Sequence, residues 1–206
     1  MQKIVLASGN KKKVKELTEL LAPFNYQIIP QKELGVEDVP ETGTTFVENA
    51  IIKARHAAEV TGLPAIADDS GIEIDYLKGQ PGIYSARFAK MNGVTNPPNG
   101  DWDQANNDLL VEKLQGVEAS KRTGRYQCIL VFMRHAADPT PLICHGAWQG
   151  KILDQEVGTN GFGYDPLFWS PEHQCASAEL TPEQKAEISH RGKALRELMA
   201  KLPEYL

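Results

Sequence analysis

The alternation of apolar and polar positions predicts that the chain opens with a strand, a helix and a second strand. Residues 3–7 form an apolar run, and residues 26–29 form another. Between them, four apolar residues recur at the spacing of one helical face: Val14, Leu17, Leu20 and Leu21. Pro23 ends this helix. A strand, a helix and a strand in succession are typical of an α/β fold.

A second helix is predicted by a capping motif and an alanine-rich face. Thr45 and Glu48 have the spacing of a capping box, and the helix that they open runs to about Thr61. We therefore expect Glu48 to cap the helix rather than to bind a ligand. Lys53 could contact a phosphate, but we expect it to be a solvated lysine on the exposed side of the helix.

The second half of the chain contains a loop, a helix and two long strands. Residues 91–103 include several turn-forming residues and predict a loop. Residues 105–114 predict a helix, and residues 125–134 and 142–148 predict a pair of antiparallel strands. We find no internal repeat, and we expect residues 1–206 to form one domain with two lobes around one core.

The apolar run 63–67 leads into two adjacent carboxylates, Asp68 and Asp69. Gly71 predicts a turn after this strand, and residues 72–77 predict the next strand. Because successive strand side chains point to opposite faces, Asp69 would face a cleft while Asp68 faces backbone donors or a positive partner. A buried charge needs such a partner or a metal ion. The alternative is a solvated turn that caps a helix.

Four lysines crowd the start of the first helix: Lys11, Lys12, Lys13 and Lys15. The helix dipole disfavours each cation there by about 0.3–1 kcal/mol. Free main-chain N–H groups at the helix start, together with the lysines, Ser8 and Asn10, would form a site for an anion such as phosphate. A lysine face that is only solvated is the alternative.

A glycine-rich segment, residues 158–166, is a second candidate site. Its three glycines let the backbone approach a ligand closely. Phe162 and Tyr164 offer aromatic faces for stacking, and Asp165 adds an acceptor. A simple turn is the alternative.

The C-terminal segment predicts two helices rather than one. Thr181 begins a helix, but in one unbroken helix Lys185 and His190 would lie about 140° apart and could not easily share a cleft. A second start, capped by Ser189, removes this conflict. His190 and Arg191 then lie in a first turn, where cations are again disfavoured unless an anion is present.

Composition excludes several classes of protein. The net charge of −5 argues against general nucleic-acid binding, which normally uses a basic face. No apolar run approaches the roughly 20 residues of a membrane span, and residues 1–3 lead directly into a strand rather than a secretion signal. Three widely spaced cysteines argue against a disulfide framework and predict a reducing, cytoplasmic location.

Six segments carry a resemblance that runs from one end of the chain to the other: residues 8–13, 46–50, 67–71, 81–87, 161–166 and 189–192. In this order they resemble the inosine triphosphate pyrophosphatase family, and within it the bacterial dITP/XTP diphosphatases. Lys12 departs from the family pattern, in which bacterial relatives often carry glycine. The stretch from Asn92 to Asp103 also looks longer than usual, and nothing is transferred to it.

The resemblance implies a two-lobed α/β fold with a long, twisted, mixed sheet flanked by helices and a central cleft. It also implies a homodimer. The implied reaction is Mg²⁺-dependent hydrolysis of ITP, dITP or XTP to the monophosphate and pyrophosphate, which removes deaminated purines from the nucleotide pool before they enter DNA or RNA.

The resemblance also implies roles for individual residues. Asp69 would be the general base and, with Glu41, a Mg²⁺ ligand. The substrate would be bound by a larger set: Ser8, Gly9, Asn10, Lys11, Lys12, Lys13, Ser70, Phe162, Gly163, Tyr164, Asp165, Lys185, His190 and Arg191. Within this set, residues 8–13 would hold the triphosphate with Ser70 beside them, and residues 162–165 would form the platform for the base.

Two other functions compete with this one. The chain could be a pyrophosphatase for modified pyrimidine triphosphates, or a nucleotide-binding regulator that has no turnover. A kinase-like enzyme is disfavoured because the chain has no Walker-type glycine loop.

Overall fold

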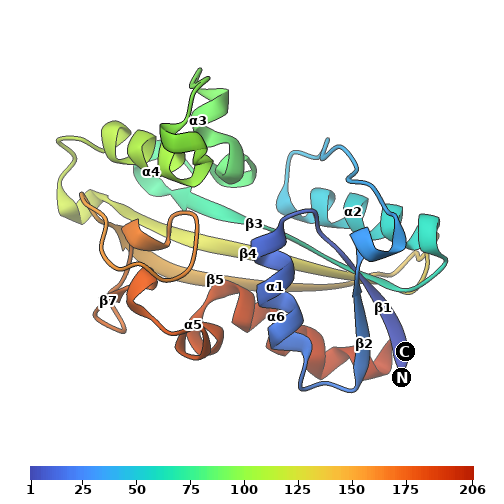
Figure 1. Cartoon of the computed structure of the whole chain (residues 1–206). Helices are drawn as coiled ribbons and strands as arrows, with labels where there is room; N and C mark the ends of the chain where they lie inside the picture. The colour runs from blue at the N-terminus through green and yellow to red at the C-terminus, as the bar shows by residue number, and fades with distance from the viewer. The chain divides into compact units, whose positions relative to one another are not determined.

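The computed structural model describes all 206 residues and contains seven strands and six α-helices (Figure 1). The strands are β1 (Gln2–Ala7), β2 (Tyr26–Pro30), β3 (Ala65–Ile74), β4 (Thr123–Met133), β5 (Leu142–Ile152), β6 (Phe168–Ser170) and β7 (Cys175–Ala176). The helices are α1 (Lys11–Leu21), α2 (Phe46–Thr61), α3 (Phe88–Met91), α4 (Trp102–Lys113), α5 (Pro182–Ile188) and α6 (His190–Lys201). No helix is both long and apolar enough to cross a membrane.

All seven strands belong to one mixed sheet, in the order β2-β1-β3-β4-β5-β6-β7. β1 pairs in parallel with both β2 and β3, so the predicted opening of strand, helix and strand is confirmed. At the other end of the sheet, β6 pairs antiparallel with β5 and with β7. The α/β class predicted from the sequence is therefore confirmed.

The chain divides into two compact units, which are described separately below. Unit 1 comprises Met1–Asp69, Cys128–Gly146 and Arg191–Leu206. Unit 2 comprises Ser70–Gln127 and Ala147–His190. Two of the boundaries, Asp69–Ser70 and His190–Arg191, fall between residues predicted to act in the site.

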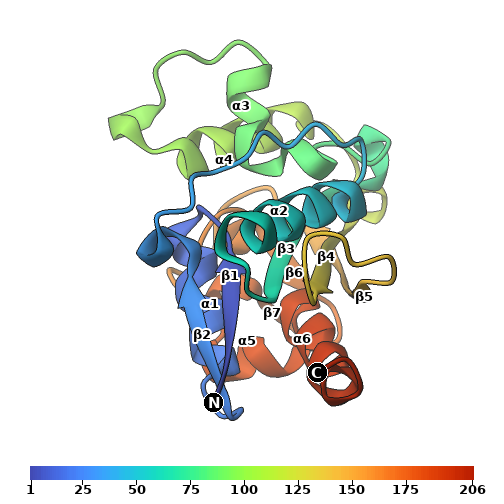
Figure 2. The same ribbon diagram turned by 90° about the vertical axis from the view of Figure 1, so that its right-hand side faces the viewer.

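Unit 1 has an apolar layer on each face of its strands. Ile4 and Leu6 of β1 pack with α1 and α6, whereas Val5 and Ala7 pack with the alanines of α2. This division follows from the alternation of side chains along a strand. Figures 1 and 2 show α2 on the opposite side of β1 from α1 and α6. The buried alanines of α2 let its backbone lie close to the sheet: Ala50, Ala54, Ala57 and Ala58.

Unit 2 has an aromatic core. Tyr126, Trp148 and Phe168 lie against one another, with ring centroids 4.6–6.3 Å apart. Leu110 and Leu114, at the end of α4, belong to the same cluster. The core therefore links the strands of this unit to the helix that covers them.

The structure corrects the prediction that a strand ends at the two aspartates. β3 continues through Asp68, Asp69, Ser70 and Gly71 to Ile74, so Gly71 forms no turn. The polar residues that interrupt the apolar pattern are accommodated inside the strand because Lys13 and Lys53 meet the two carboxylates. A charge with a partner can be buried where an isolated one cannot.

The predicted loop 91–103 is shorter than expected, and α4 begins at Trp102 rather than at residue 105. The Asp101 side chain accepts hydrogen bonds from the main-chain N–H groups of Asp103 and Gln104, which is an N-cap. The capping box of α2 and the break between α5 and α6 at the extended Ser189 are confirmed.

Candidate functional site

Asp68 lies within a cluster of positive charge in unit 1. Its side chain is fully buried, 3.1 Å from Lys13 Nζ and 3.7 Å from the guanidinium of Arg191. Burial alone would raise the pKa of Asp68, but the charges of Lys13, Arg191 and Lys53 lower it well below its usual range. This confirms the prediction that Asp68 faces positive partners. The Asp68 carboxylate therefore stays ionised and holds the Lys13 and Arg191 side chains in place.

Asp69 and Glu41 share a single cation, Lys53 of α2. The Lys53 Nζ atom lies 3.1 Å from Glu41 Oε1 and 3.2 Å from Asp69 Oδ1, and it donates a 2.6 Å hydrogen bond to the main-chain oxygen of Asp68. Lys53 is largely buried, so the expectation of a solvated lysine was wrong. One signal in the sequence indicated this: Lys53 follows Ala50 by three residues and precedes Ala57 by four, which places it on the buried face.

The two carboxylates of β3 differ in their affinity for protons. Burial raises the pKa of Asp69, and Glu41 and Asp68 add to this, while Lys53 and Lys13 oppose it. The Oδ2 atom of Asp69 is buried and has no hydrogen-bond partner in the protein. Asp69 is therefore the carboxylate that is available to accept a proton or to bind a cation.

Glu41 lies in a loop that α2 anchors at its N-terminus. The Gly43 N–H donates a 2.8 Å hydrogen bond to Asn49 Oδ1, and Glu48 accepts from the main chain of Thr44 and Thr45. A Cβ atom at position 43 would lie 2.5 Å from Glu48 Cβ, so only glycine fits there. Glu48 is confirmed as a cap.

At the start of α1, the main-chain N–H groups that were predicted to bind an anion have a partner within the protein. Asn10 Oδ1 accepts hydrogen bonds from the main-chain N–H groups of Lys12 and Lys13, so these two donors are not free. Lys11 and Lys12 are exposed, whereas Lys13 reaches Asp68. The carboxylate of Asp38 occupies the space beside Gly9 where a side chain would otherwise lie. Ser8 Oγ accepts from the Asn10 N–H.

Arg191 also has partners within unit 1. It forms a 2.7 Å ion pair with Glu16 of α1 and is almost fully buried. The prediction that a cation in this first turn requires an external anion is therefore wrong, because Glu16 and Asp68 supply the negative charge.

The donors in unit 1 fit a divalent cation that is shared with a ligand. The structure contains no group of three or more His, Cys, Asp or Glu side chains that could hold a metal ion alone. Glu41 and Asp69 provide two carboxylates, and Asp69 Oδ2 has no partner within the protein. Mg²⁺ is commonly held by one or two carboxylates together with substrate phosphates and water, so these two residues fit Mg²⁺.

Asp165 organises the glycine-rich segment of unit 2. Its Oδ1 atom accepts from the hydroxyls of Tyr126 (3.2 Å) and Ser177 (2.8 Å). Its Oδ2 atom accepts from Lys185 Nζ (2.6 Å) and the Phe162 N–H (2.9 Å). The carboxylate is buried and both oxygens are engaged within unit 2. Asp165 therefore acts as an anchor for the residues around it.

Phe162 and Lys185 are placed together by this anchor. The ammonium of Lys185 lies 5.2 Å from the centre of the half-buried Phe162 ring, within the range of a cation–π contact. Lys185 keeps further N–H groups beyond the one that Asp165 accepts. Tyr164, in contrast, is buried and donates to the main-chain oxygen of Ser85 (2.7 Å), so Phe162 is the more accessible ring.

His190 stacks on Tyr126, with ring centroids 4.5 Å apart and planes 8° from parallel. Because the Tyr126 hydroxyl also bonds to Asp165, one side chain of β4 contacts two predicted site residues. Ser70, half-buried in β3, begins unit 2.

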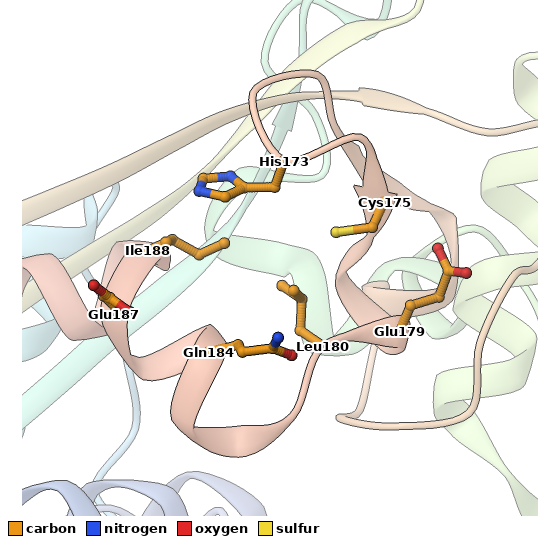
Figure 3. A pocket seen from close by; sticks show the side chains of 7 residues that line it. All are labelled: His173, Cys175, Glu179, Leu180, Gln184, Glu187 and Ile188. Carbon is orange, nitrogen blue, oxygen red and sulfur yellow. The ribbon is translucent and has the colours of Figure 1, made fainter.

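A separate hollow of about 470 Å³ lies on another side of α5 (Figure 3). Its lining consists of His173, Cys175, Glu179, Leu180, Gln184, Glu187 and Ile188. None of the predicted site residues is among them. Within α5, Gln184 and Ile188 line this hollow, whereas Lys185 turns to Asp165.

An open mixed sheet, with the carboxylates of β3 paired to lysines of α1 and α2, defines an α/β protein. The chain belongs to the Ham1 family, which it matches over residues 4–201. It is 58% identical over 204 residues to the dITP/XTP pyrophosphatase of Photobacterium profundum, covering 99% of this chain and 100% of the relative. It is 54% identical to the protein of the same name from Escherichia coli O157:H7, covering 97% of each chain.

Solved structures show the same fold. A HAM1 protein from Coxiella burnetii is similar with a TM-score of 0.87 and 48% identity, over 99% of this chain and 100% of that one. The Ham1 protein of Staphylococcus aureus is similar with a TM-score of 0.82 and 37% identity, over the whole of both chains.

Proposed function

We propose that this protein hydrolyses deaminated purine nucleoside triphosphates (ITP, dITP and XTP) to the monophosphate and pyrophosphate. The observation that carries the proposal is the trio of Glu41, Lys53 and Asp69, in which two carboxylates and one ammonium meet. Relatives that are more than half identical over nearly the whole chain are named dITP/XTP pyrophosphatases. The proposed reaction removes these nucleotides from the pool used for DNA and RNA synthesis.

In this proposal, Asp69 accepts a proton from the attacking water. The water oxygen forms a bond to the α-phosphorus, the bond from that phosphorus to the bridging oxygen breaks, and pyrophosphate leaves with the bonding electrons. The raised pKa of Asp69 suits a general base, because a more basic carboxylate takes a proton more readily. Lys53 and Lys13 neutralise charge on the phosphates.

Glu41 and Asp69 would hold Mg²⁺ together with the triphosphate. The bound ion would withdraw negative charge from the phosphate oxygens and make the α-phosphorus a better electrophile. Lys53, which contacts both carboxylates in this structure, would offset the repulsion between their negative charges before the ion binds. Ser8, Gly9 and Asn10 would shape the main chain beside the phosphates.

In unit 2, the Phe162 ring would stack on the purine, and Lys185 would donate a hydrogen bond to an oxygen of the base. An oxo group at the 6 position accepts such a bond, whereas the amino group of adenine cannot. A buried donor left without an acceptor costs free energy, which is how a site of this kind rejects ATP. His190 in this unit and Arg191 in unit 1 would complete the contacts with the nucleotide.

The test is the Asp69→Asn variant assayed for pyrophosphate release from ITP, XTP, ATP and dTTP, with and without Mg²⁺. We expect wild type to favour ITP and XTP, and the variant to lose at least 100-fold in kcat while its thermal unfolding is unchanged. Retained turnover would remove Asp69 from the role of base. Preference for dTTP would favour a pyrimidine pyrophosphatase, and binding of ITP without turnover would favour a regulator.

We also propose that the protein is a homodimer, which rests on the family resemblance. A cytoplasmic location is proposed from the three free cysteines. Light scattering coupled to gel filtration measures the mass in solution directly.

A further inference from the structure

The first two turns of α4 hold the main chain of Gly163. The Gly163 N–H donates to Asp103 Oδ2 at 3.3 Å, and the Gly163 oxygen accepts from Asn107 Nδ2 at 3.0 Å. Both polar groups of this residue's main chain are therefore bound by α4. These two main-chain groups therefore need no hydrogen-bond partner from a ligand. The two hydrogen bonds also constrain the loop on which Phe162 lies.

The orientation of the Asn107 amide follows from its neighbours. Its Nδ2 atom faces two acceptors, the Gly163 oxygen and Glu156 Oε1 (3.1 Å), so the nitrogen must point that way. The Oδ1 atom is then left buried without a hydrogen-bond partner, in a side chain that is 4% exposed. A buried unpaired acceptor destabilises a protein. An apolar side chain would avoid that cost, so what the amide contributes is its two donated hydrogen bonds, to Gly163 and to Glu156.

Gly163 needs to be held from outside. It has a φ of +61°, and no atom lies within 4 Å of the position of a Cβ atom there. The position requires glycine because of its backbone conformation, and glycine is also the residue that loses most conformational freedom on folding. Gly161, with a φ of +75°, lies on the other side of Phe162. The two hydrogen bonds from α4 therefore restrain a ring that is flanked by two glycines.

We propose that Asn107 and Asp103 are positioning residues for recognition of the base. This inference rests on the proposed function. By fixing Gly163, they fix the Phe162 ring relative to Lys185, which the same loop contacts through Asp165. Hydrogen-bond discrimination between an oxo and an amino group depends on this geometry, and displacements of about 1 Å are enough to weaken it. Neither residue contacts the phosphates in this assignment.

The test compares Asn107→Ala with Gln104→Ala. Gln104 donates to the same Glu156 oxygen (3.0 Å) from the same helix, but no hydrogen bond joins it to Gly163, so it is a matched control. We expect Asn107→Ala to raise the KM for ITP about tenfold and to lower the ratio of ITP to ATP turnover. The inhibition constant of inorganic tripolyphosphate, which has no base, should change less than twofold. Gln104→Ala should resemble wild type in its KM for ITP, its ratio of ITP to ATP turnover and its inhibition constant for tripolyphosphate.

A second pair of variants covers the case in which Asn107→Ala does not fold. Asp103→Asn keeps an oxygen that accepts from the Gly163 N–H, whereas Asp103→Ala removes it. We expect only Asp103→Ala to show the raised KM for ITP with unchanged inhibition by tripolyphosphate. A loss of tripolyphosphate binding equal to the loss of ITP binding would overturn the proposal, and so would a KM for ITP within twofold of wild type in both Asn107→Ala and Asp103→Ala.

Binding of the product IMP separates a loss of base positioning from a loss of catalysis. Calorimetric binding of IMP to the same variants requires no turnover, and we expect it to weaken about tenfold in Asn107→Ala. If wild type releases no pyrophosphate from ITP but IMP binding responds in this way, the positioning role stands while the catalytic proposal falls.

Discussion

The anchoring role of Asp165 leads to a sharp prediction for the Asp165→Asn variant. An amide can reproduce the hydrogen bonds of this site. Its oxygen can accept from Lys185 and the Phe162 N–H, and its nitrogen can donate to the hydroxyls of Tyr126 and Ser177, which can turn to accept. The substitution therefore removes the negative charge and little else.

The magnitude follows from the burial of the ion pair. The side chains of Lys185 and Asp165 are 10% and 2% exposed, and the pair is 2.6 Å long. Removing one partner of a buried pair costs about 3–5 kcal/mol, because the other charge is left uncompensated. For a chain of this size, each kcal/mol lowers Tm by about 2–4 °C, so we expect a fall of roughly 6–20 °C.

Circular dichroism during thermal unfolding at pH 7 measures this change. The control is Asp154→Asn, the same substitution at an exposed aspartate in the same unit, which should shift Tm by no more than about 2 °C. An Asp165→Asn protein that melts within 2 °C of wild type would refute the anchoring role.

Two further predictions concern unit 1. Burial raises the pKa of Asp69, so this base becomes protonated, and kcat/KM falls, at a higher pH than for an ordinary aspartate. A series of rate measurements against pH should show this fall, and raising the Mg²⁺ concentration should move it to lower pH. Asp138→Asn should lower the free energy of unfolding at pH 7 by about 2 kcal/mol, because Asp138 accepts from the guanidinium and N–H of Arg134. Hydrogen bonds from Arg134 lower the pKa of Asp138, so urea titrations should show this difference narrowing as the pH falls below about 3.9.

Local signals in the sequence predicted most of the elements correctly. The capping box at Thr45 and Glu48 and the helix break at Ser189 depend on residues within four positions of each other, and both are confirmed. The strand through Asp68 was predicted to end too early because the pattern contains no information about Lys13, which lies 55 positions earlier and allows the carboxylate to be buried. The same limit hid the buried position of Lys53.

The sequence by itself determined the α/β class, the starts of α2 and α5 and the identity of the residues that carry charge, because periodicity and capping are properties of neighbouring residues. Only the tertiary structure decided which charges meet. It paired Arg191 with Glu16, joined Glu41 and Asp69 through Lys53, and engaged both oxygens of Asp165. Electrostatic partners and hydrogen bonds are set by distances in space between residues far apart in the chain, and no spacing along the sequence specifies those distances.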